Sequence, residues 1–288
     1  RPQPNSKILG MPFKLWIYNL GGEKGIGKWL RRKYGEAPVL LSELSVDRNI
    51  EIIDNYMENR GFFQVAVEGD TVGNGKKASA LYKVATGPEY KIRSIAFPAD
   101  SSALSHAVRA TQSKTLLRPG APFNLDLLKG ERTRIDLELK EKGFYFFSGE
   151  YLLFETDTTI GNHEVNLYMQ VKRETPADAK QTYRINDVLI YANYDISTAA
   201  EDTARIYAEF HQGFYVIDSS KLFNPRVFEQ SMQFQPGDLY SRKDHNTSLS
   251  RLISLGNFKF VKNRFQPVTD SGELKLNAFY YLTPLPRK

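Results

Sequence analysis

The sequence contains no cysteine and only four histidines. The absence of cysteine excludes disulfide bonds and cysteine nucleophiles, but it leaves the cellular compartment open, because an exported protein can also avoid this residue. The histidines show neither the H-x-H nor the H-E-x-x-H spacing of a metal site; they are His106, His163, His211 and His245. The sequence also lacks a G-x-S-x-G motif and any apolar run that approaches a membrane-spanning length. We therefore expect no catalytic residue, no metal and no cofactor.

A glycine-rich stretch, "GGEKGIGKW" (residues 21–29), is the one short motif that suggests a nucleotide. It matches the phosphate-binding pattern G-x-x-x-x-G-K-[ST] up to its lysine. Trp29 stands where a hydroxyl group would bind Mg²⁺, and no parallel βαβ series follows. We interpret the stretch as a turn, and a nucleotide- or nucleic-acid-binding protein that uses residues 22–28 remains an alternative.

The chain carries a formal net charge of +6. Because the basic residues are spread along the chain, we interpret this charge as a mildly basic surface and expect no nucleic acid as a partner. The segment "KWLRRKY" (residues 28–34) combines cations with aromatic side chains, which leaves contact with anionic lipid or an acidic protein surface open. We prefer a local helix in which Trp29 and Leu30 pack inward.

One local pattern occurs three times: an amphipathic helix, a glycine, an aromatic residue and a strand of alternating polarity. It occupies residues 45–70, 125–157 and 241–265. The glycine stands where each helix stops, a position at which a positive φ angle is common and costs glycine no Cβ clash. These glycines are Gly61, Gly143 and Gly256. A polar turn and a second strand follow each time, which predicts a helix followed by an antiparallel hairpin.

Two of these repeats begin with a further strand and a first helix, so that their order is β-α-α-β-β. A Pro-Gly loop separates the two helices in both, whereas the first repeat has no opening strand. Breaker residues mark the junctions between repeats. We therefore predict an α+β fold with three serial domains: residues 1–90, with an inserted connection; residues 91–176; and residues 177–288, with an insertion at 196–223.

This pattern resembles the POTRA domain, the periplasmic repeat of the BamA/TamA family of outer-membrane assembly proteins. Members carry a G-F/Y-F step after the second helix, and similar steps stand at residues 61–63, 143–145 and, with asparagine in the middle, 256–258. The opening "RPQPNSKILG" together with "KWLRRKYGEAPVLL" resembles the N-terminal region of the TamA-like lipoprotein (TamL) of Bacteroides relatives. The resemblance covers essentially the whole chain.

The resemblance implies three POTRA-like domains, the first without its opening strand, on the periplasmic side of the cell outer membrane of a Gram-negative, Bacteroides-like bacterium. It implies a role in protein transport and membrane-protein assembly rather than an enzyme. A membrane β-barrel is expected after Lys288, and a lipid anchor and signal segment are expected before Arg1. The implied partners are unfolded outer-membrane client proteins and TamB-like or other assembly-machine subunits.

Small α+β domains without a catalytic site can offer their sheet edges to partners. If the last strand is central, the second strand is an edge whose unpaired N–H and C=O groups can receive an extended client chain. The candidate client-binding residues are Phe63, Gln64, Val65, Ala66, Val67, Phe146, Phe147, Tyr151, Leu153, Phe258, Lys259, Phe260, Val261 and Lys262. Alternation places Phe258, Phe260 and Lys262 on one face of the last edge and Lys259 and Val261 on the other. A cell-surface adhesin-like structural protein remains a further alternative.

Overall fold

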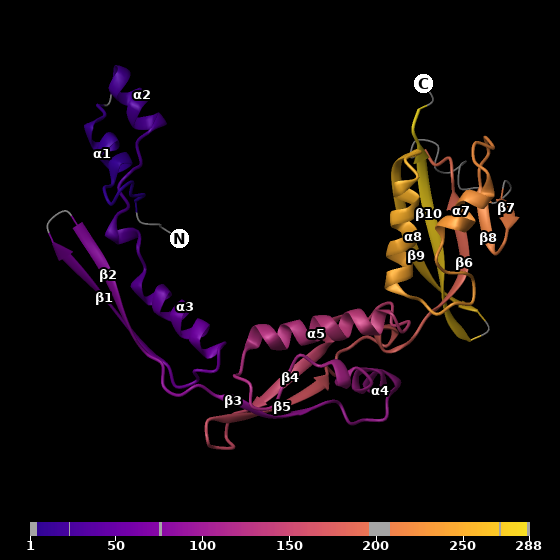
Figure 1. Ribbon diagram of the computed structural model, residues 1–288, viewed down its shortest axis with the longest axis horizontal. Helices are drawn as coiled ribbons and strands as arrows, with labels where there is room; N and C mark the ends of the chain where they lie inside the picture. The colour runs from indigo at the N-terminus through magenta and orange to yellow at the C-terminus, as the bar shows by residue number, and fades with distance from the viewer. Residues whose placement is uncertain (1–4, 23, 75–76, 196–207, 271, 287–288) are drawn as a thin grey trace. The chain divides into compact units, whose positions relative to one another are not determined.

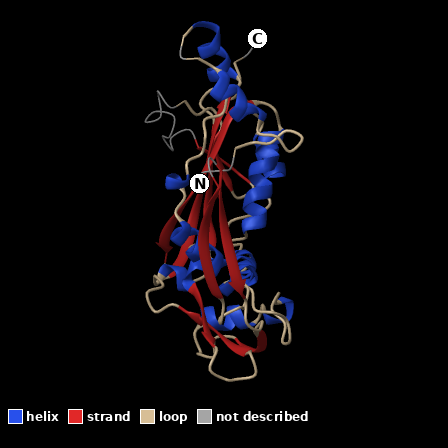
Figure 2. Cartoon of the chain, turned by 90° about the vertical axis from the view of Figure 1, so that its left-hand side faces the viewer, coloured by secondary structure: helices blue, strands red, loops and turns tan. Residues whose placement is uncertain are grey.

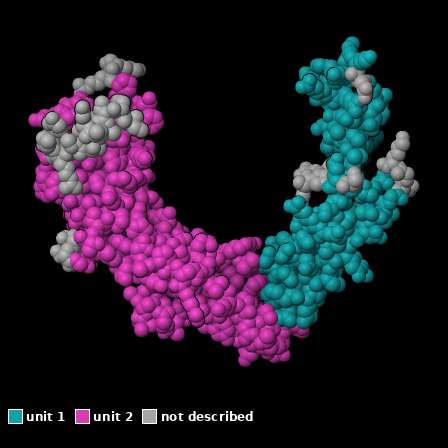
Figure 3. All heavy atoms as spheres, turned by 180° about the vertical axis from the view of Figure 1, so that it is seen from behind, with its two compact units in different colours: residues 1–90 teal, residues 91–288 magenta. Residues whose placement is uncertain are grey.

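The computed structural model describes residues 5–22, 24–74, 77–195, 208–270 and 272–286. The chain divides into two compact units, the N-terminal unit (residues 1–90) and the C-terminal unit (residues 91–288), which Figure 3 colours separately. Helices and strands are mixed along the described chain (Figure 2). The predicted α+β class is therefore confirmed.

The N-terminal unit consists of helices followed by one antiparallel hairpin (Figure 1). Ser45 caps the third helix by accepting a hydrogen bond from the backbone N–H of Arg48, at 3.2 Å. The hairpin is a sheet of two strands only, so the described residues contain no opening strand beside it. The elements are α1 (Phe13–Leu20), α2 (Gly25–Lys33), η1 (Leu41–Glu43), α3 (Val46–Glu58), β1 (Ala66–Asn74) and β2 (Lys77–Ala85).

The C-terminal unit begins with a three-stranded sheet in the order β3-β5-β4. Its central strand runs parallel to β3 and antiparallel to β4. The long helix α5 covers this sheet (Figure 1), and Ile135 and Leu139 of the helix pack against Leu152 and Met169 in the core. The elements are β3 (Lys91–Ala96), α4 (Ala103–Arg109), η2 (Gln112–Lys114), α5 (Leu125–Lys140), η3 (Gly149–Tyr151), β4 (Leu152–Asp157) and β5 (Glu164–Val171).

A five-stranded sheet in the order β7-β8-β6-β10-β9 completes this unit. The predicted β-α-α-β-β order recurs as β6, α7, α8, β9 and β10. The predicted insertion supplies β7 and β8: β8 pairs with β6, and β7 pairs with β8. Residues 196–207 of the insertion lie outside the described chain. The elements are η4 (Asp178–Lys180), β6 (Arg184–Tyr191), β7 (Ala208–His211), β8 (Phe214–Ile217), α7 (Pro225–Ser231), α8 (Arg242–Ser254), β9 (Phe258–Asp270) and β10 (Glu273–Pro284).

Both sheets of the C-terminal unit have the same pair of backbone hydrogen bonds between the opening strand and the Pro-Gly loop. In the first, Ile92 donates to Ala121 O at 2.9 Å and accepts from the N–H of Gly120 at 2.7 Å. In the second, Ile185 donates to Asp238 O and accepts from Gly237, both at 2.8 Å. The loop between the two helices is therefore fixed to the start of the opening strand in the same way each time.

The three predicted helix-stop glycines have positive φ angles of 89°, 88° and 70° in chain order. A second backbone bond accompanies each turn. Gly61 O accepts from the N–H of Tyr90, Gly143 O accepts from Tyr183, and Asn257 O accepts from Leu285, each at 2.9 Å. The turn after α3, α5 or α8 therefore also forms a backbone hydrogen bond to the residue at which the chain leaves that repeat.

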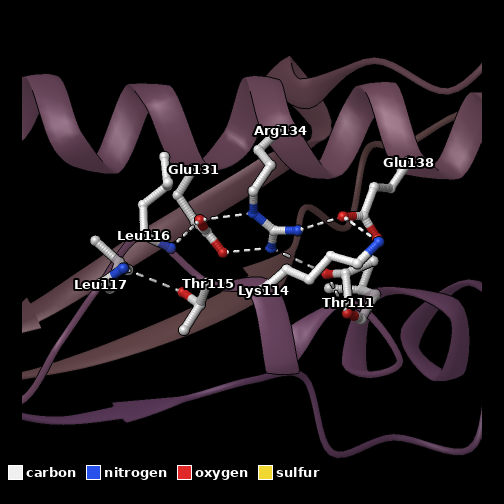
Figure 4. Close-up of polar contacts among 9 residues, drawn as sticks. Thr111, Lys114, Thr115, Leu116, Leu117, Glu131, Arg134 and Glu138 are labelled. Atoms are coloured by element: carbon white, nitrogen blue, oxygen red, sulfur yellow. Dashed lines mark hydrogen bonds and ion pairs between the residues drawn. The ribbon is translucent and has the colours of Figure 1, made fainter.

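A buried ion pair fixes the connection between α4 and α5 (Figure 4). The carboxylate of Glu131 is fully buried and accepts two bonds from Arg134, at 3.0 and 2.6 Å, and one from the backbone N–H of Leu116, at 2.9 Å. Burial alone would raise the pKa of Glu131, but these hydrogen bonds outweigh it and hold the pKa below its ordinary value. Arg134 also reaches Glu138 and Thr111, so one guanidinium joins α5 to the preceding connection.

Candidate functional site: the sheet edges

The first strand of each hairpin lies at the edge of its sheet. β4 borders the three-stranded sheet, β9 borders the five-stranded sheet, and both strands of the N-terminal hairpin are edges among the described residues. An edge strand presents a row of backbone donors and acceptors without a neighbouring strand. These edges are the candidate binding surfaces.

β9 is the longest of the candidate edges, with 13 residues, and it pairs with β10 along its length. A bulge interrupts the register, since Phe260 pairs with Thr283 but Phe258 pairs with Pro284. The extra residue brings Phe258 to the helix-covered side of the sheet, where its ring lies 5.0 Å from the ring of Phe223. The predicted alternation, which placed Phe258 with Phe260 and Lys262, is therefore wrong at its first residue.

From Val261 to Gln266, half-buried or buried residues of β9 alternate with exposed ones. Val261 packs against the core cluster and Phe265 belongs to it, while the side chain of Phe260 is 62% exposed. Lys259 and Lys262 are exposed as well. The outer part of this edge is therefore apolar at Phe260 and otherwise basic.

The second candidate edge is shorter than predicted, because β4 begins at Leu152. Phe146, Phe147 and Tyr151 were expected in the strand, but they precede it. The chain turns there instead: the N–H of Phe147 bonds to Phe144 O at 3.2 Å, and a 3₁₀ helix follows. Phe147 is 1% exposed, because the core of the unit takes up its ring. Only Leu153, at 42% exposed, lies on the edge strand itself.

The first candidate edge also starts later than predicted, because β1 begins at Ala66. Ala66 and Val67 lie in the strand, whereas Phe63, Gln64 and Val65 form the turn before it. The reason is Tyr90: its ring lies 5.1 Å from that of Phe63, and its hydroxyl receives a bond of 3.2 Å from the Gln64 amide. These contacts stabilise a turn at residues 63–65, where a strand was expected.

Tyr145 lies in the turn after α5 and packs against the helix-covered face of β9, a contact that the sequence did not indicate. Its ring lies 4.8 Å from Tyr240 and 5.8 Å from Phe265 of β9. Beside it, the ring of Phe146 lies 5.2 Å from that of Tyr183. The aromatic step after Gly143 therefore packs into the core of the five-stranded sheet instead of forming an edge strand.

Polar contacts reinforce this junction. Glu141 accepts from the hydroxyl of Ser241 at 2.6 Å and from the backbone N–H of Lys243 at 2.9 Å, at the start of α8. Arg242 lies 3.7 Å from Asp136 of α5. A carboxylate is favourable at the N-terminus of a helix, because unpaired N–H groups and the helix dipole are positive there. The junction thus fixes α8, which packs beside β9.

His245 of α8 reaches β9 directly. Its ring nitrogens contact the hydroxyl of Tyr240, at 3.0 Å, and the side-chain amide of Asn263. Burial lowers the pKa of His245, because the charged imidazolium loses its hydration there. Burial also raises the pKa of Tyr240. The helix-covered face of β9 is therefore held by a neutral, hydrogen-bonded set of side chains.

In the glycine-rich stretch, α2 already begins at Gly25, so helix occupies positions that a phosphate loop would need as loop. Lys28 lies within α2, and a Cβ added to Gly27 would be 2.7 Å from the backbone nitrogen of Gly22. These glycines thus permit close backbone packing. Within the described residues, no group of three His, Asp or Glu side chains is placed to hold a metal ion, and no helix is long and apolar enough to cross a bilayer.

No protein-family model and no curated protein matches this sequence. Solved structures are similar to it at low identity. A crystal structure of BamA POTRA3-5 from Haemophilus influenzae is 17% identical with a TM-score of 0.44, over 82% of this chain and 79% of that one. POTRA1-3 of the periplasmic domain of Omp85 from Anabaena is 13% identical with a TM-score of 0.29, over 99% and 93%. CdiB from Acinetobacter baumannii is 16% identical with a TM-score of 0.26, over 83% and 37%.

Proposed function

We propose that this chain is a periplasmic POTRA-like module of an outer-membrane assembly or secretion factor, and that it binds extended client chains by adding them to its sheet edges. The observation that carries the proposal is β9, a 13-residue strand at the border of the five-stranded sheet. Its inner side is fixed by β10 and its helix-covered face by α8, so the strand is ordered before a client arrives.

The energetics suit a client of variable sequence. A backbone hydrogen bond contributes about 1 kcal/mol net, so four or five of them give weak, sequence-tolerant binding. Edges in series raise the effective concentration of a long client. The exposed Lys259 and Lys262 discourage pairing between two copies of β9 while admitting an uncharged or acidic client.

Pro267 indicates which residues of β9 offer their N–H groups to a client. It pairs with Leu276 of β10 although it has no N–H, so its nitrogen is expected to face the outer edge. Backbone groups of residues two apart point the same way. The N–H of Val261 is therefore expected to face outward, whereas that of Lys262 faces β10.

Proline substitutions test the proposal. Val261→Pro should weaken the capture of an extended peptide more than Val261→Ala, while leaving the helix content unchanged. Lys262→Pro should instead destabilise the sheet, because it removes a bond to β10. Photocrosslinks should appear at alternate residues along 258–265. Equal capture by the two Val261 variants, or crosslinks that fall on 241–255, would contradict strand addition at β9.

We further propose that the protein is a TamA-like lipoprotein with a C-terminal membrane β-barrel, a lipid anchor and a TamB-type partner, in a Bacteroides-like outer membrane. The resemblance of the opening segment supports this reading. The sequence of the full gene tests it: a lipobox and a series of alternating barrel strands are expected. A gene without either would contradict it.

The division into domains 91–176 and 177–288 is likewise proposed. The two sheets have separate core clusters, which supports it. A chain cut after residue 176 should retain the hydrogen-exchange protection of α5 and β5. Loss of that protection would show that residues 91–288 fold only together.

A further inference from the structure

The first two helices leave their apolar side chains in solvent. Neither α1 nor α2 contains a buried residue. The indoles of Trp16 and Trp29 are 58% and 53% exposed, and Ile26 is 79% exposed. The expected inward packing of Trp29 and Leu30 is therefore wrong. A group of large exposed apolar side chains on neighbouring helices is typical of a binding surface.

The exposed side chains form a stripe on each helix. Phe13, Trp16 and Leu20 stand three and four positions apart on α1, and all are at least half exposed. The rings of Phe13 and Trp16 stack with their centroids 5.8 Å apart. This spacing places all three on one face of the helix.

On α2 the apolar stripe consists of Ile26, Trp29 and Leu30. The helix packs against α1 through a different side, since the guanidinium of Arg31 lies 4.0 Å from the ring centroid of Tyr18. The contact between the helices therefore leaves this stripe uncovered.

The net charge of the protein resides in the same segment. Residues 7–35 hold seven of the 39 basic residues and one of the 33 acidic ones, so the remaining chain has equal numbers of both signs. The other 32 basic residues are spread along the chain, as interpreted above, but 32 acidic residues balance them. Six of the seven cations are exposed: Lys7, Lys14, Lys24, Lys28, Arg32 and Lys33.

A groove of about 560 Å³ opens in this segment. Its charged lining residues are Lys14, Lys33 and Glu36, and its apolar ones include Ile8, Phe13, Ile17 and Tyr34. The carboxylate of Glu36 accepts hydrogen bonds from Ser6, and the two lysines leave the wall with a net positive charge. A cationic wall beside apolar side chains fits a molecule that carries an anionic head and a hydrocarbon part. Helices with Lys and Arg on the polar side and Trp, Phe or Leu on the other lie in the headgroup region of bilayers.

We propose that residues 5–22 and 24–41 form a docking surface for an anionic lipid bilayer, with the two apolar stripes inserted among the headgroups and the exposed cations on the lipid phosphates. An apolar protein partner would account for the stripes, but it would not account for a segment that holds seven basic and two acidic residues between positions 5 and 41. Each cation near an anionic surface adds to the attraction, which salt weakens.

The chain contains its own reporter, because its only two tryptophans are Trp16 and Trp29. The full 288-residue protein is mixed with vesicles of phosphatidylcholine and phosphatidylglycerol in equal parts, and with vesicles of phosphatidylcholine alone. Emission from the free protein should be that of water-exposed indole. The mixed vesicles should shift it to the blue and co-sediment the protein, and added salt should reverse both. Trp16→Phe and Trp29→Phe should each retain a shift from the other indole.

Charge and apolar variants separate the two contributions. Lys28→Glu with Arg32→Glu should weaken partition into the mixed vesicles at least about tenfold. Ile26→Ser should also weaken it. The matched control is Lys259→Glu with Lys262→Glu, which makes the same charge change on exposed residues of β9 and should leave partition unchanged.

Four results would overturn the proposal: no shift with the mixed vesicles, equal binding to neutral vesicles, equal loss in the β9 control, or a blue emission that depends on protein concentration without lipid. The last result would mean that a second copy of the chain covers the stripes. A shift confined to one indole would contradict insertion of both helices.

Discussion

The hydroxyl of Ser241 donates a hydrogen bond of 2.6 Å to the carboxylate of Glu141, a residue one hundred positions earlier in the chain. The same carboxylate also receives the backbone N–H of Lys243, so a side chain from just after α5 completes the cap of α8. The two sheets of the C-terminal unit are thereby joined through the end of one helix and the beginning of another.

Glu141→Ala should destabilise this junction by about 0.5–1 kcal/mol, because α8 loses an anion and an acceptor at its N-terminus. Hydrogen exchange should show the effect first at the amides of residues 242–245. Glu150→Ala provides a comparison within the same unit, since Glu150 pairs with Arg132 away from α8. Unchanged hydrogen exchange at the start of α8 in the Glu141 variant would show that this carboxylate does not stabilise the helix.

Gly143→Val should destabilise the C-terminal unit by about 1–3 kcal/mol. Gly143 has a φ angle of 88°, and a Cβ there would be 2.7 Å from Leu239 Cδ1. Gly161→Val is the matched control, because its φ angle of 80° is similar but nothing lies within 4 Å of its added Cβ. Urea unfolding of both variants separates backbone strain from crowding. Equal losses would mean that Leu239 moves aside without cost.

Glu131→Ala should cost about 3–5 kcal/mol, because it leaves the guanidinium of Arg134, whose side chain is only 15% exposed, without its main partner. The amide of Leu116 also loses its acceptor. Lys114→Ala, on a side chain that is 72% exposed, should cost less than about 1 kcal/mol. Denaturant unfolding measures both. Similar small losses would show that water replaces the carboxylate.

Mild acid should destabilise the five-stranded sheet through His245. Burial lowers its folded pKa, so the neutral form contributes stability that is complete above the unfolded value of about 6.5 and is lost as pH falls toward the folded value. The facing groups are the Tyr240 hydroxyl and the Asn263 amide, and the positive charge of Arg242 acts in the same direction. Thermal unfolding should therefore shift downward between about pH 7.5 and 5.5.

His245→Gln should flatten this pH dependence, whereas substitution of the exposed His106 by Gln should leave it intact. If both variants keep the same slope as the parent protein, another group controls the acid response.

The sequence predicted those features that depend on local periodicity. Helical stripes and a glycine with positive φ lie within one stretch of chain, so α3, α5 and α8 and their stop positions were recognisable. The run of aromatics after Gly143 was misread as a strand, because local alternation does not reveal that Tyr145 and Phe146 pack against distant rings. The bulge before Phe260 was not predicted for a similar reason, because it depends on how β9 pairs with β10. The exposed stripes of α1 and α2 have the pattern of core-facing helices, and only the structure shows that no described residue buries them.

The bond between the helix-stop turn and the departing chain has a mechanical consequence. At the end of each repeat, a backbone N–H bonds to a carbonyl in the turn after the helix. Tyr90 and Tyr183 bond to the helix-stop glycine, and Leu285 bonds to Asn257. Tension along the chain at these points is carried by a main-chain clamp rather than by a side chain. Because these bonds join backbone groups only, they are compatible with almost any side chain at either position. Repeats of very different sequence can therefore follow one another with the same connection between them.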